Sequence, residues 1–311
     1  MPSTGPNHRN LSHRIHVRHQ PFGDQRFPLP GEHGTVVWNS RSHRKGRKPR
    51  WQPPGGQAAL STRTAPFRWW GWEPHNLSWW VGFLFTIGSV VWLVNGSLLM
   101  WPVAARSFEN WSTALSAFVG GSIFLFGAYA ALAEVFNRRP FLEVHRTGDA
   151  PPSIHLAHHP DQPTPREKRW FLFAVESGSW AWWLNAAQMV GATVFLIACA
   201  AGLLLPAGPS FPERPWYWDP QMIGASFFLL ASLMALVEAQ EKIWKPAWKR
   251  LGWHAAFFNG VGAVGFFLCA WYGANTSSPD SLYWGSTFST FWGSLAFLLA
   301  SYLMLLEALN P

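Results

Sequence analysis

The chain has 311 residues, enough for one or two domains, and its mean hydropathy of +0.01 averages two very different regions. Residues 1–78 are polar, basic and rich in Pro, Gly, His and Arg, whereas residues 79–311 hold nearly all of the long apolar runs. The sequence lacks a P-loop, a nucleophile elbow and an HExxH motif, and Cys199 and Cys269 lack metal-ligand spacing. We therefore expect a protein that is not an enzyme and that holds no cofactor or metal.

Residues 1–66 form a basic tail that we expect to be disordered and cytoplasmic. Twelve Lys and Arg residues up to Arg68 stand against only Asp24 and Glu32, so the net charge of +8 resides in this tail. No helical or strand period runs through it, and Pro and Gly recur too often for a packed core. The cluster RSHRKGRKPR at 41–50 also fits a nucleic-acid or nuclear-import patch, and a basic start weakly resembles a transit peptide. Because membrane helices follow, we expect the tail to contact anionic lipid headgroups and no nucleic acid.

Six apolar runs pass the length of about 20 residues that spans a bilayer. Few charges interrupt these runs, and the charges that do so sit at the ends. Runs of this kind with short connections predict an all-α polytopic membrane protein in contact with the lipid bilayer. The predicted spans are residues 79–101, 112–134, 182–205, 220–239, 253–273 and 284–308.

The distribution of basic residues predicts that both termini are cytoplasmic. The tail, the 136–180 loop and the 240–252 loop hold 22 of the 24 Lys and Arg residues, and the alternate connections hold only Arg106 and Arg214. Basic loops stay on the cytoplasmic side of a membrane. Tryptophans gather at both ends of the predicted spans, at the headgroup level that amphipathic rings prefer.

One pattern occurs three times in the membrane region. A Gly lies fourteen residues before a Glu, a Phe ten before it and a Leu two before it, in the stretches 120–134, 224–238 and 293–307. The preceding helices also align, each with a Trp nine residues before a Gly and an aromatic residue four after that Gly. We therefore predict three tandem two-helix hairpins related by an axis along the membrane normal. Their ranges are 67–135, 181–240 and 241–311, with a cytoplasmic loop at 136–180.

The glycines at equivalent positions of the three hairpins are predicted to pack helices against one another. Small residues let helix backbones approach closely in lipid, where there is no hydrophobic drive between helices. These packing residues are Gly88, Gly120, Gly191, Gly224, Gly262 and Gly293.

The G-S-x-x-F-L-x-x-S core at 293–301, together with its upstream hairpin partner, resembles the YrhK-like domain, a short bacterial two-helix membrane domain. The resemblance covers about one hairpin per copy and leaves the tail and the loops unmatched. It implies a repeated fold unit and brings no activity or mechanism with it.

The candidate functional residues are the acids that end the repeated stretch, Glu134, Glu238 and Glu307. Acids at equivalent places in three repeats could form a cluster that binds a cation or relays protons, since membrane carboxylates are functional by default. The alternative is that they lie at the inner interface and pair with a base one turn on, as Arg138 follows Glu134 and Lys242 follows Glu238. Glu307 has no such base after it.

Polar side chains inside the odd-numbered spans come next. Gln188 and Asn259 occupy the same repeat position, three residues before the aligned glycine, and Asn185 lies nearby. Interhelical hydrogen bonds explain them, or else they line a path for a polar substrate. Only His254 lies at a helix, so the facing axial ligands of a membrane haem are not expected.

Two further motifs lie in the connections. His155, His158 and His159 beside Asp161 are a possible metal site in a Pro-rich loop. The tripeptides that begin at Asn110 and Asn275 fit glycosylation sequons on the outer side of the membrane.

Two functions fit this sequence. The first is a non-enzymatic integral membrane protein that scaffolds, assembles or senses through helix packing and its tail, with a protein partner or a second copy of itself. The second is a small ion or proton transporter or channel that uses Glu134, Glu238 and Glu307.

Overall fold

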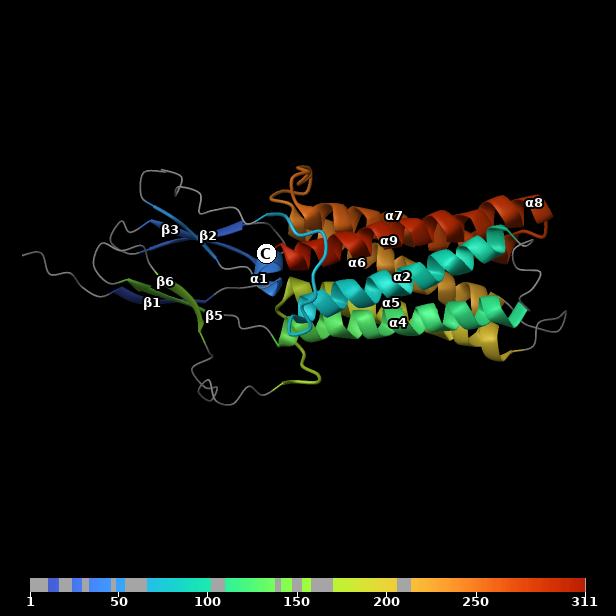
Figure 1. Cartoon of the computed structure of the whole chain (residues 1–311), viewed down its shortest axis with the longest axis horizontal. Helices are drawn as coiled ribbons and strands as arrows, with labels where there is room; N and C mark the ends of the chain where they lie inside the picture. The colour runs from blue at the N-terminus through green and yellow to red at the C-terminus, as the bar shows by residue number, and fades with distance from the viewer. Residues whose placement is uncertain are drawn as a thin grey trace, which may run out of the picture.

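Six long helices lie side by side in one bundle, and two three-stranded sheets lie beyond one of its ends (Figure 1). The computed structural model describes residues 11–16, 24–29, 34–45, 49–53, 66–101, 110–137, 141–146, 153–157, 170–205 and 214–310. The six helices are α2 (Leu77–Met100), α4 (Asn110–Phe136), α5 (Trp180–Leu204), α6 (Asp219–Ala239), α7 (Leu251–Asn275) and α9 (Phe288–Leu309).

The prediction of six membrane-spanning helices is confirmed. Each of the six is long and apolar enough to cross a bilayer, and each covers one predicted span with ends that differ by a few residues. The last span of the second hairpin and that of the third begin five residues earlier than predicted, because the π-helical segments η2 (Arg214–Trp218) and η3 (Leu282–Thr287) precede α6 and α9. A single turn, α8 (Pro279–Ser281), leads into η3.

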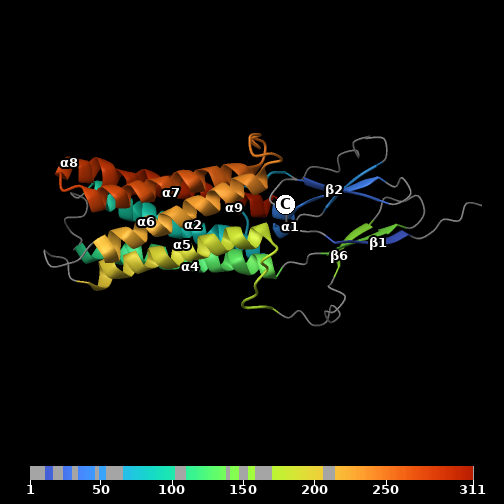
Figure 2. The same ribbon diagram turned by 180° about the vertical axis from the view of Figure 1, so that it is seen from behind.

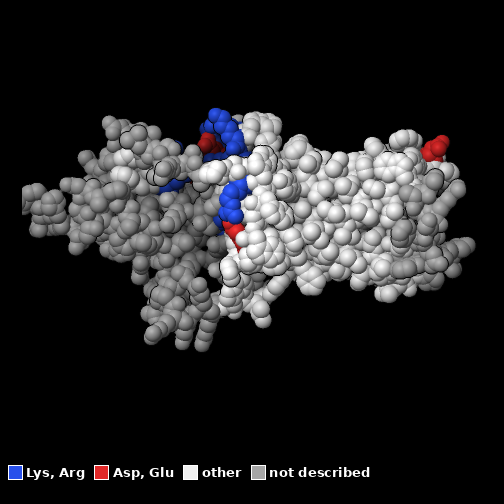
Figure 3. Space-filling model, in the orientation of Figure 1, with Lys and Arg blue, Asp and Glu red and all other residues white. Residues whose placement is uncertain are grey.

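The helices close into a ring in chain order. Each packs on its two neighbours, and α2 packs on α9 to complete the circle (Figures 1 and 2). Apolar side chains such as Phe126 and Val94 point outward, being 63% and 51% exposed. On the face that Figure 3 shows, the visible charged side chains lie near the two ends of the bundle, with an uncharged belt between them. The chain is therefore a multi-pass integral membrane protein whose apolar belt contacts lipid.

Two layers of aromatic rings fill the centre of the ring. Trp92, Phe195 and Phe266, one from each odd-numbered span, have ring centroids 5.0–5.5 Å apart. Phe124, Phe228 and Phe297 from the other three helices form a second triangle, with centroids 5.6–6.5 Å apart. Both triangles occupy equivalent positions of the predicted repeat and are buried.

Close helix contact inside each hairpin depends on the paired glycines. A Cβ on Gly88 would lie 2.6 Å from the Phe124 ring, and one on Gly120 would lie 2.8 Å from Trp92. The other two hairpins bring their glycines to similar contacts, Gly191 with Gly224 and Gly262 with Gly293. A side chain at these positions would push the helices apart.

A second contact occurs at two matching positions of the predicted hairpins. Asn310 exchanges two hydrogen bonds with the backbone of Arg68, and Tyr302 donates to the carbonyl of Trp69. Two helices further round the ring, Tyr129 of α4 and Asn137, the residue after α4, contact Leu172 and Phe171 in the same way. In both places the segment that enters one hairpin is fastened to the last helix of another.

The described part of the tail carries more regular structure than the sequence predicts. One antiparallel sheet joins β2 (Asp24–Pro28), β3 (Thr35–Asn39) and β4 (Arg50–Gln52) around the buried Leu29, Val36 and Trp38. Gly34 has φ +91° between the first two strands, a conformation that L side chains rarely adopt. The second sheet has the order β1 (Leu11–His16), β5 (Phe141–Arg146), β6 (Ser153–Ala157), so it joins the tail to the 136–180 loop. Residues 1–10, 17–23, 30–33, 46–48 and 54–65 of the tail lie outside the described residues.

Candidate functional site

A five-residue helix of the tail, α1 (Ser40–Arg44), lies against the end of the bundle where α4, α6 and α9 finish (Figure 1). It follows β3 directly, and the Asn39 side chain caps it by accepting a hydrogen bond of 3.0 Å from the backbone N–H of Ser42. Asn39 in turn donates to Asp24, whose other carboxylate oxygen accepts from Arg250 of the bundle at 3.2 Å. The sheet and the bundle therefore hold α1 between them.

Two basic side chains of α1 and that of Lys45, the residue after it, point to one side, and Lys45 is counted with α1 below. Arg41, Arg44 and Lys45 have the spacing i, i+3 and i+4, which places them on one face of a helix. All three are buried, with side chains that are 11%, 5% and 4% exposed.

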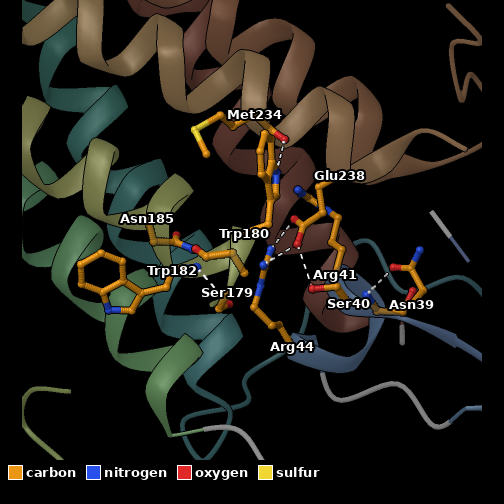
Figure 4. Close-up of polar contacts among 12 residues, drawn as sticks. Asn39, Ser40, Arg41, Arg44, Ser179, Trp180, Trp182, Asn185, Met234 and Glu238 are labelled. Carbon is orange, nitrogen blue, oxygen red and sulfur yellow. Dashed lines mark hydrogen bonds and ion pairs between the residues drawn. The ribbon is translucent and has the colours of Figure 1, made fainter. Parts of the chain in front are cut away.

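Each basic side chain of α1 pairs with one of the three candidate glutamates. Arg44 contacts Glu238 through two hydrogen bonds of 2.6 Å (Figure 4). Arg41 contacts Glu307 at 2.8 Å, and Lys45 contacts Glu134 at 3.3 Å. The structure thus brings the ends of three different helices to one cluster of six charges.

Two hydroxyl groups complete this cluster. Ser40 of α1 donates to Glu238 at 3.1 Å, and Ser78 at the start of α2 donates to Glu134. A buried carboxylate costs several kcal/mol unless it is paired and hydrogen-bonded. The hydroxyl and cationic donors supply such partners to all three carboxylates. We call this set of six charged side chains and two hydroxyl groups the charge cluster.

The electrostatics differ between the basic groups. Burial opposes the charge on Arg41, but Glu307 and the other two carboxylates outweigh it and raise the pKa of the guanidinium above its ordinary value. For Lys45, burial is the larger effect and lowers the pKa of the ammonium below 10.5, although Glu134 and Glu307 act against it. The pKa of Lys45 and the pKa of Arg41 are thus shifted in opposite directions.

The predicted partners of the glutamates were wrong where the structure tests them. Glu238 pairs with Arg44 of the tail, whereas Lys242 lies over the ring of Trp244, 5.9 Å from its centroid. Helix α6 ends at Ala239, so Lys242 is no longer one helical turn from Glu238. Arg138 lies outside the described residues. Glu307, for which the sequence offered no base, pairs with Arg41.

A cavity of about 80 Å³ with polar and apolar lining residues lies between the charge cluster and the aromatic layers. Arg41, Arg44, Lys45 and Glu134 line its outer end, and Phe85, Phe124 and Phe297 line its inner end. Its walls include the predicted polar residues Asn185, Gln188 and Asn259, together with Ser89 and Ser301.

Beyond the aromatic layers, at the other end of the bundle, lies a larger cavity of about 340 Å³. The space between the two cavities is lined by the aromatic triangles and amounts to about 10 Å³. The bundle axis therefore passes through two cavities with an aromatic barrier between them.

The predicted polar residues differ in the hydrogen bonds that they form. Asn259 donates an interhelical hydrogen bond of 2.7 Å to Ser232 of α6, as predicted for packing in lipid. Asn185 instead donates to the carbonyl of Ala181 in its own helix. His254 contacts the carbonyl of Trp248 at 2.8 Å at the start of α7.

The remaining sequence motifs are only partly described. His158, His159 and Asp161 lie outside the described residues, and of His155 only the strand position is described. Over the described ranges, no group of three His, Cys, Asp or Glu residues could hold a metal ion. Asn275 is exposed and is the last residue of α7. The side chain of Asn110 lies outside the described part.

Sequence reasoning found the three glutamates and missed the basic residues that contact them. The sequence did hold a signal for these basic residues, because the spacing of Arg41, Arg44 and Lys45 places them on one helical face, within the cluster that was assigned to lipid headgroups.

No protein-family model, no curated protein and no solved structure matches the chain. The fold alone thus defines its class, a six-helix integral membrane protein.

Proposed function

We propose that this protein is a conduit for small cations along the axis of its helix ring, held closed by the basic helix α1. The observation that carries the proposal is the convergence of Glu134, Glu238 and Glu307 on the basic side chains of the tail, beside a cavity that Glu134 and those basic side chains line. Carboxylates that meet inside a membrane bundle attract cations, and rings of Asp and Glu are a common basis of cation selectivity.

The positive charges of α1 would close this conduit. With α1 in place, three cationic side chains of the tail occupy the positions that permeating cations would otherwise take. Removal of α1 would leave three buried carboxylates without these partners, and water and mobile cations would replace them. The two aromatic triangles form a second, hydrophobic barrier further along the axis.

The orientation of this conduit follows the basic loops. The expectation that basic segments are cytoplasmic puts the charge cluster on the cytoplasmic side, so that α1 would close the conduit from within. The exposed basic residues near α1 would also suit contact with anionic headgroups. The resemblance to the YrhK-like domain remains a proposal about the ancestry of each hairpin.

The experiment is potassium efflux from liposomes that contain the purified protein. The variant Arg41→Gln/Arg44→Gln/Lys45→Gln should leak faster than the wild-type chain, and adding Glu134→Gln/Glu238→Gln/Glu307→Gln should remove the preference for cations over anions. The control Lys242→Gln/Lys245→Gln/Lys249→Gln removes the same charge from exposed side chains beside the bundle. Equal efflux from the wild-type, the α1 variant and the control would refute the conduit.

A second candidate is a non-enzymatic scaffold or sensor that binds a protein partner or a second copy of itself. The complete pairing of the glutamates by α1 favours it, because such pairing fits a permanent structural role. Its test is a pull-down in mild detergent with the full chain and with a chain that lacks residues 1–66. A partner that binds both equally would exclude a role for the tail in recruitment.

A further inference from the structure

The larger cavity, at the end of the bundle remote from α1, has the composition of a ligand site. Its volume of about 340 Å³ falls in the range of small-molecule pockets. All six helices contribute to its lining, and no Lys, Arg, Asp or Glu is among the lining residues. A charged organic ligand that filled this cavity would meet no side chain of opposite charge.

The polar groups of this cavity gather on one wall. Gln221 and Thr290 donate to the sulfur of Cys269 at 3.3 and 3.0 Å, and Ser286 lies 3.4 Å from the same sulfur. All four side chains are buried, yet all four line the cavity. Hydroxyl and amide groups in this position would hydrogen-bond an uncharged polar group of a ligand.

Aromatic rings form the floor and part of the rim. Trp92 and Phe195 of the first aromatic triangle close the cavity on the inside, while Tyr217 and Trp218 line it near the start of α6. Rings in such positions stack against a flat apolar body. The cavity therefore offers one hydrogen-bonding wall and two aromatic surfaces.

Two aromatic rings of the rim pack closely against glycines of neighbouring helices. The ring of Tyr217 lies against Gly202, where a Cβ would approach it to 2.8 Å, and the indole of Trp218 lies against Gly273. A site whose side chains are already positioned loses less entropy when a ligand binds.

The two π-helical segments of the described chain both border this cavity. Tyr217 and Trp218 come from η2, and Ser286 and Thr287 come from η3. π-Helical turns are rare and frequently lie at functional sites. In both cases the widened turn precedes a span, so two of the three hairpins present irregular backbone to the same space.

From these observations we infer that the cavity binds a small uncharged organic molecule with a flat ring and a hydrogen-bonding group such as an amide or a hydroxyl. The ring would lie against Trp92, Tyr217 and Trp218, and the polar group would face Gln221 and Thr290. This inference does not rest on the proposed conduit, because its test measures protection of a thiol and not ion flux.

The native cysteine Cys269 makes the site measurable in the full chain. In a Cys199→Ala variant, the rate at which the uncharged reagent N-ethylmaleimide modifies Cys269 is followed by mass spectrometry. The probe is benzamide, compared with its near-isosteric charged analogues benzoate and benzamidine. Benzamide should slow modification about fivefold at saturation, and the two ions should leave the rate unchanged.

A double variant tests whether the polar wall is responsible. Gln221→Leu/Thr290→Val should lose the protection by benzamide, while Ser226→Ala/Thr193→Val, which alters hydroxyls that bond only within their own helices, should keep it. Failure of Cys269 to react, equal protection by all three probes, or protection that survives in the Gln221→Leu/Thr290→Val variant would each overturn the inference.

Discussion

Arg44 donates hydrogen bonds of 2.6 Å from Nη1 and Nη2 to the two carboxylate oxygens of Glu238, and the two side chains are only 5% and 1% exposed. The partners lie 194 residues apart in the chain, one in the basic tail and the other at the end of α6. A fork of two parallel bonds fixes the orientation of α1 as well as its position, which a single Lys contact would not do.

Breaking this pair from one side should be costly. Arg44→Gln or Glu238→Gln leaves a buried charge without its partner, and the expected loss of stability is about 3–5 kcal/mol. The double variant should lose less than the sum of the two, because neither charge then remains. Thermal unfolding in detergent measures all three, with Arg68→Gln of the exposed Arg68–Glu73 pair as the control. Additive losses would show that the two side chains act independently.

Gly252 should be intolerant of even a methyl group. A Cβ at this position would clash with Nε of Arg41 and would lie 2.7 Å from Oε1 of Glu307. Gly252→Ala should therefore displace Arg41 from its carboxylate and cost about 1–3 kcal/mol, as overpacking does. Gly178→Ala is the matched control, since nothing lies within 4 Å of its added atom. If the two variants melt at the same temperature, Arg41 does not occupy the place described.

The titration of Lys45 gives a pH dependence with a definite sign. Burial lowers its pKa below 10.5 when α1 is docked. Between the lowered pKa and 10.5 the free tail binds more protons than the docked tail, so docking should strengthen as pH rises through that window and level off above it. Arg41, whose pKa is raised, stays charged throughout.

Hydrogen exchange at the amides of α1 reports this docking from about pH 7 upward, after correction for the intrinsic pH dependence of exchange. The variant Lys45→Met should remove the rise, because it has no proton to lose. Protection that falls with pH in the wild-type chain would contradict the assignment of Lys45 to a buried site.

The aromatic layers should resist truncation. Phe195 is buried and contacts Trp92, Phe228 and Phe266, so Phe195→Ala should cost about 3–5 kcal/mol through the cavity it leaves. In the Arg41→Gln/Arg44→Gln/Lys45→Gln background it should also increase potassium efflux, since it opens the barrier on the axis. Phe126→Ala, at an outward-facing position, should change neither quantity appreciably. An unaltered efflux from the Phe195→Ala chain would remove the aromatic barrier from the account.

Much of the membrane architecture follows from local pattern. Apolar length alone fixes the six spans, and the equal spacing of Gly88 and Gly120 with their counterparts anticipates which residues meet inside each hairpin. The aromatic residues four positions after those glycines form the two triangles. These features depend on residues close together in sequence or on a repeated period, and both are visible in a single chain.

The charge cluster could not be predicted in the same way. Lys242 is near Glu238 in sequence but falls beyond the end of its helix, whereas Arg44 reaches it from the other end of the chain. The sheet that presents α1 has short strands and a core of only three buried side chains, so its pattern is too weak to stand out among Pro and Gly residues. Contacts between residues this far apart in sequence depend on how the helix ring closes and on where the tail lies against it.

The central claim is that the positive face of α1 closes a ring of three carboxylates, and exchange of the two sets of charges tests it most directly. Potassium efflux from liposomes is measured for Arg41→Glu/Arg44→Glu/Lys45→Glu, for Glu134→Lys/Glu238→Lys/Glu307→Lys, and for the chain with both sets. Gel filtration in detergent confirms that each chain is folded before the comparison. The account predicts a leak when the acidic α1 faces the native glutamates and its suppression when both sets are exchanged. A leak that persists in the doubly exchanged chain, or that never occurs in the acidic α1 chain, would contradict it.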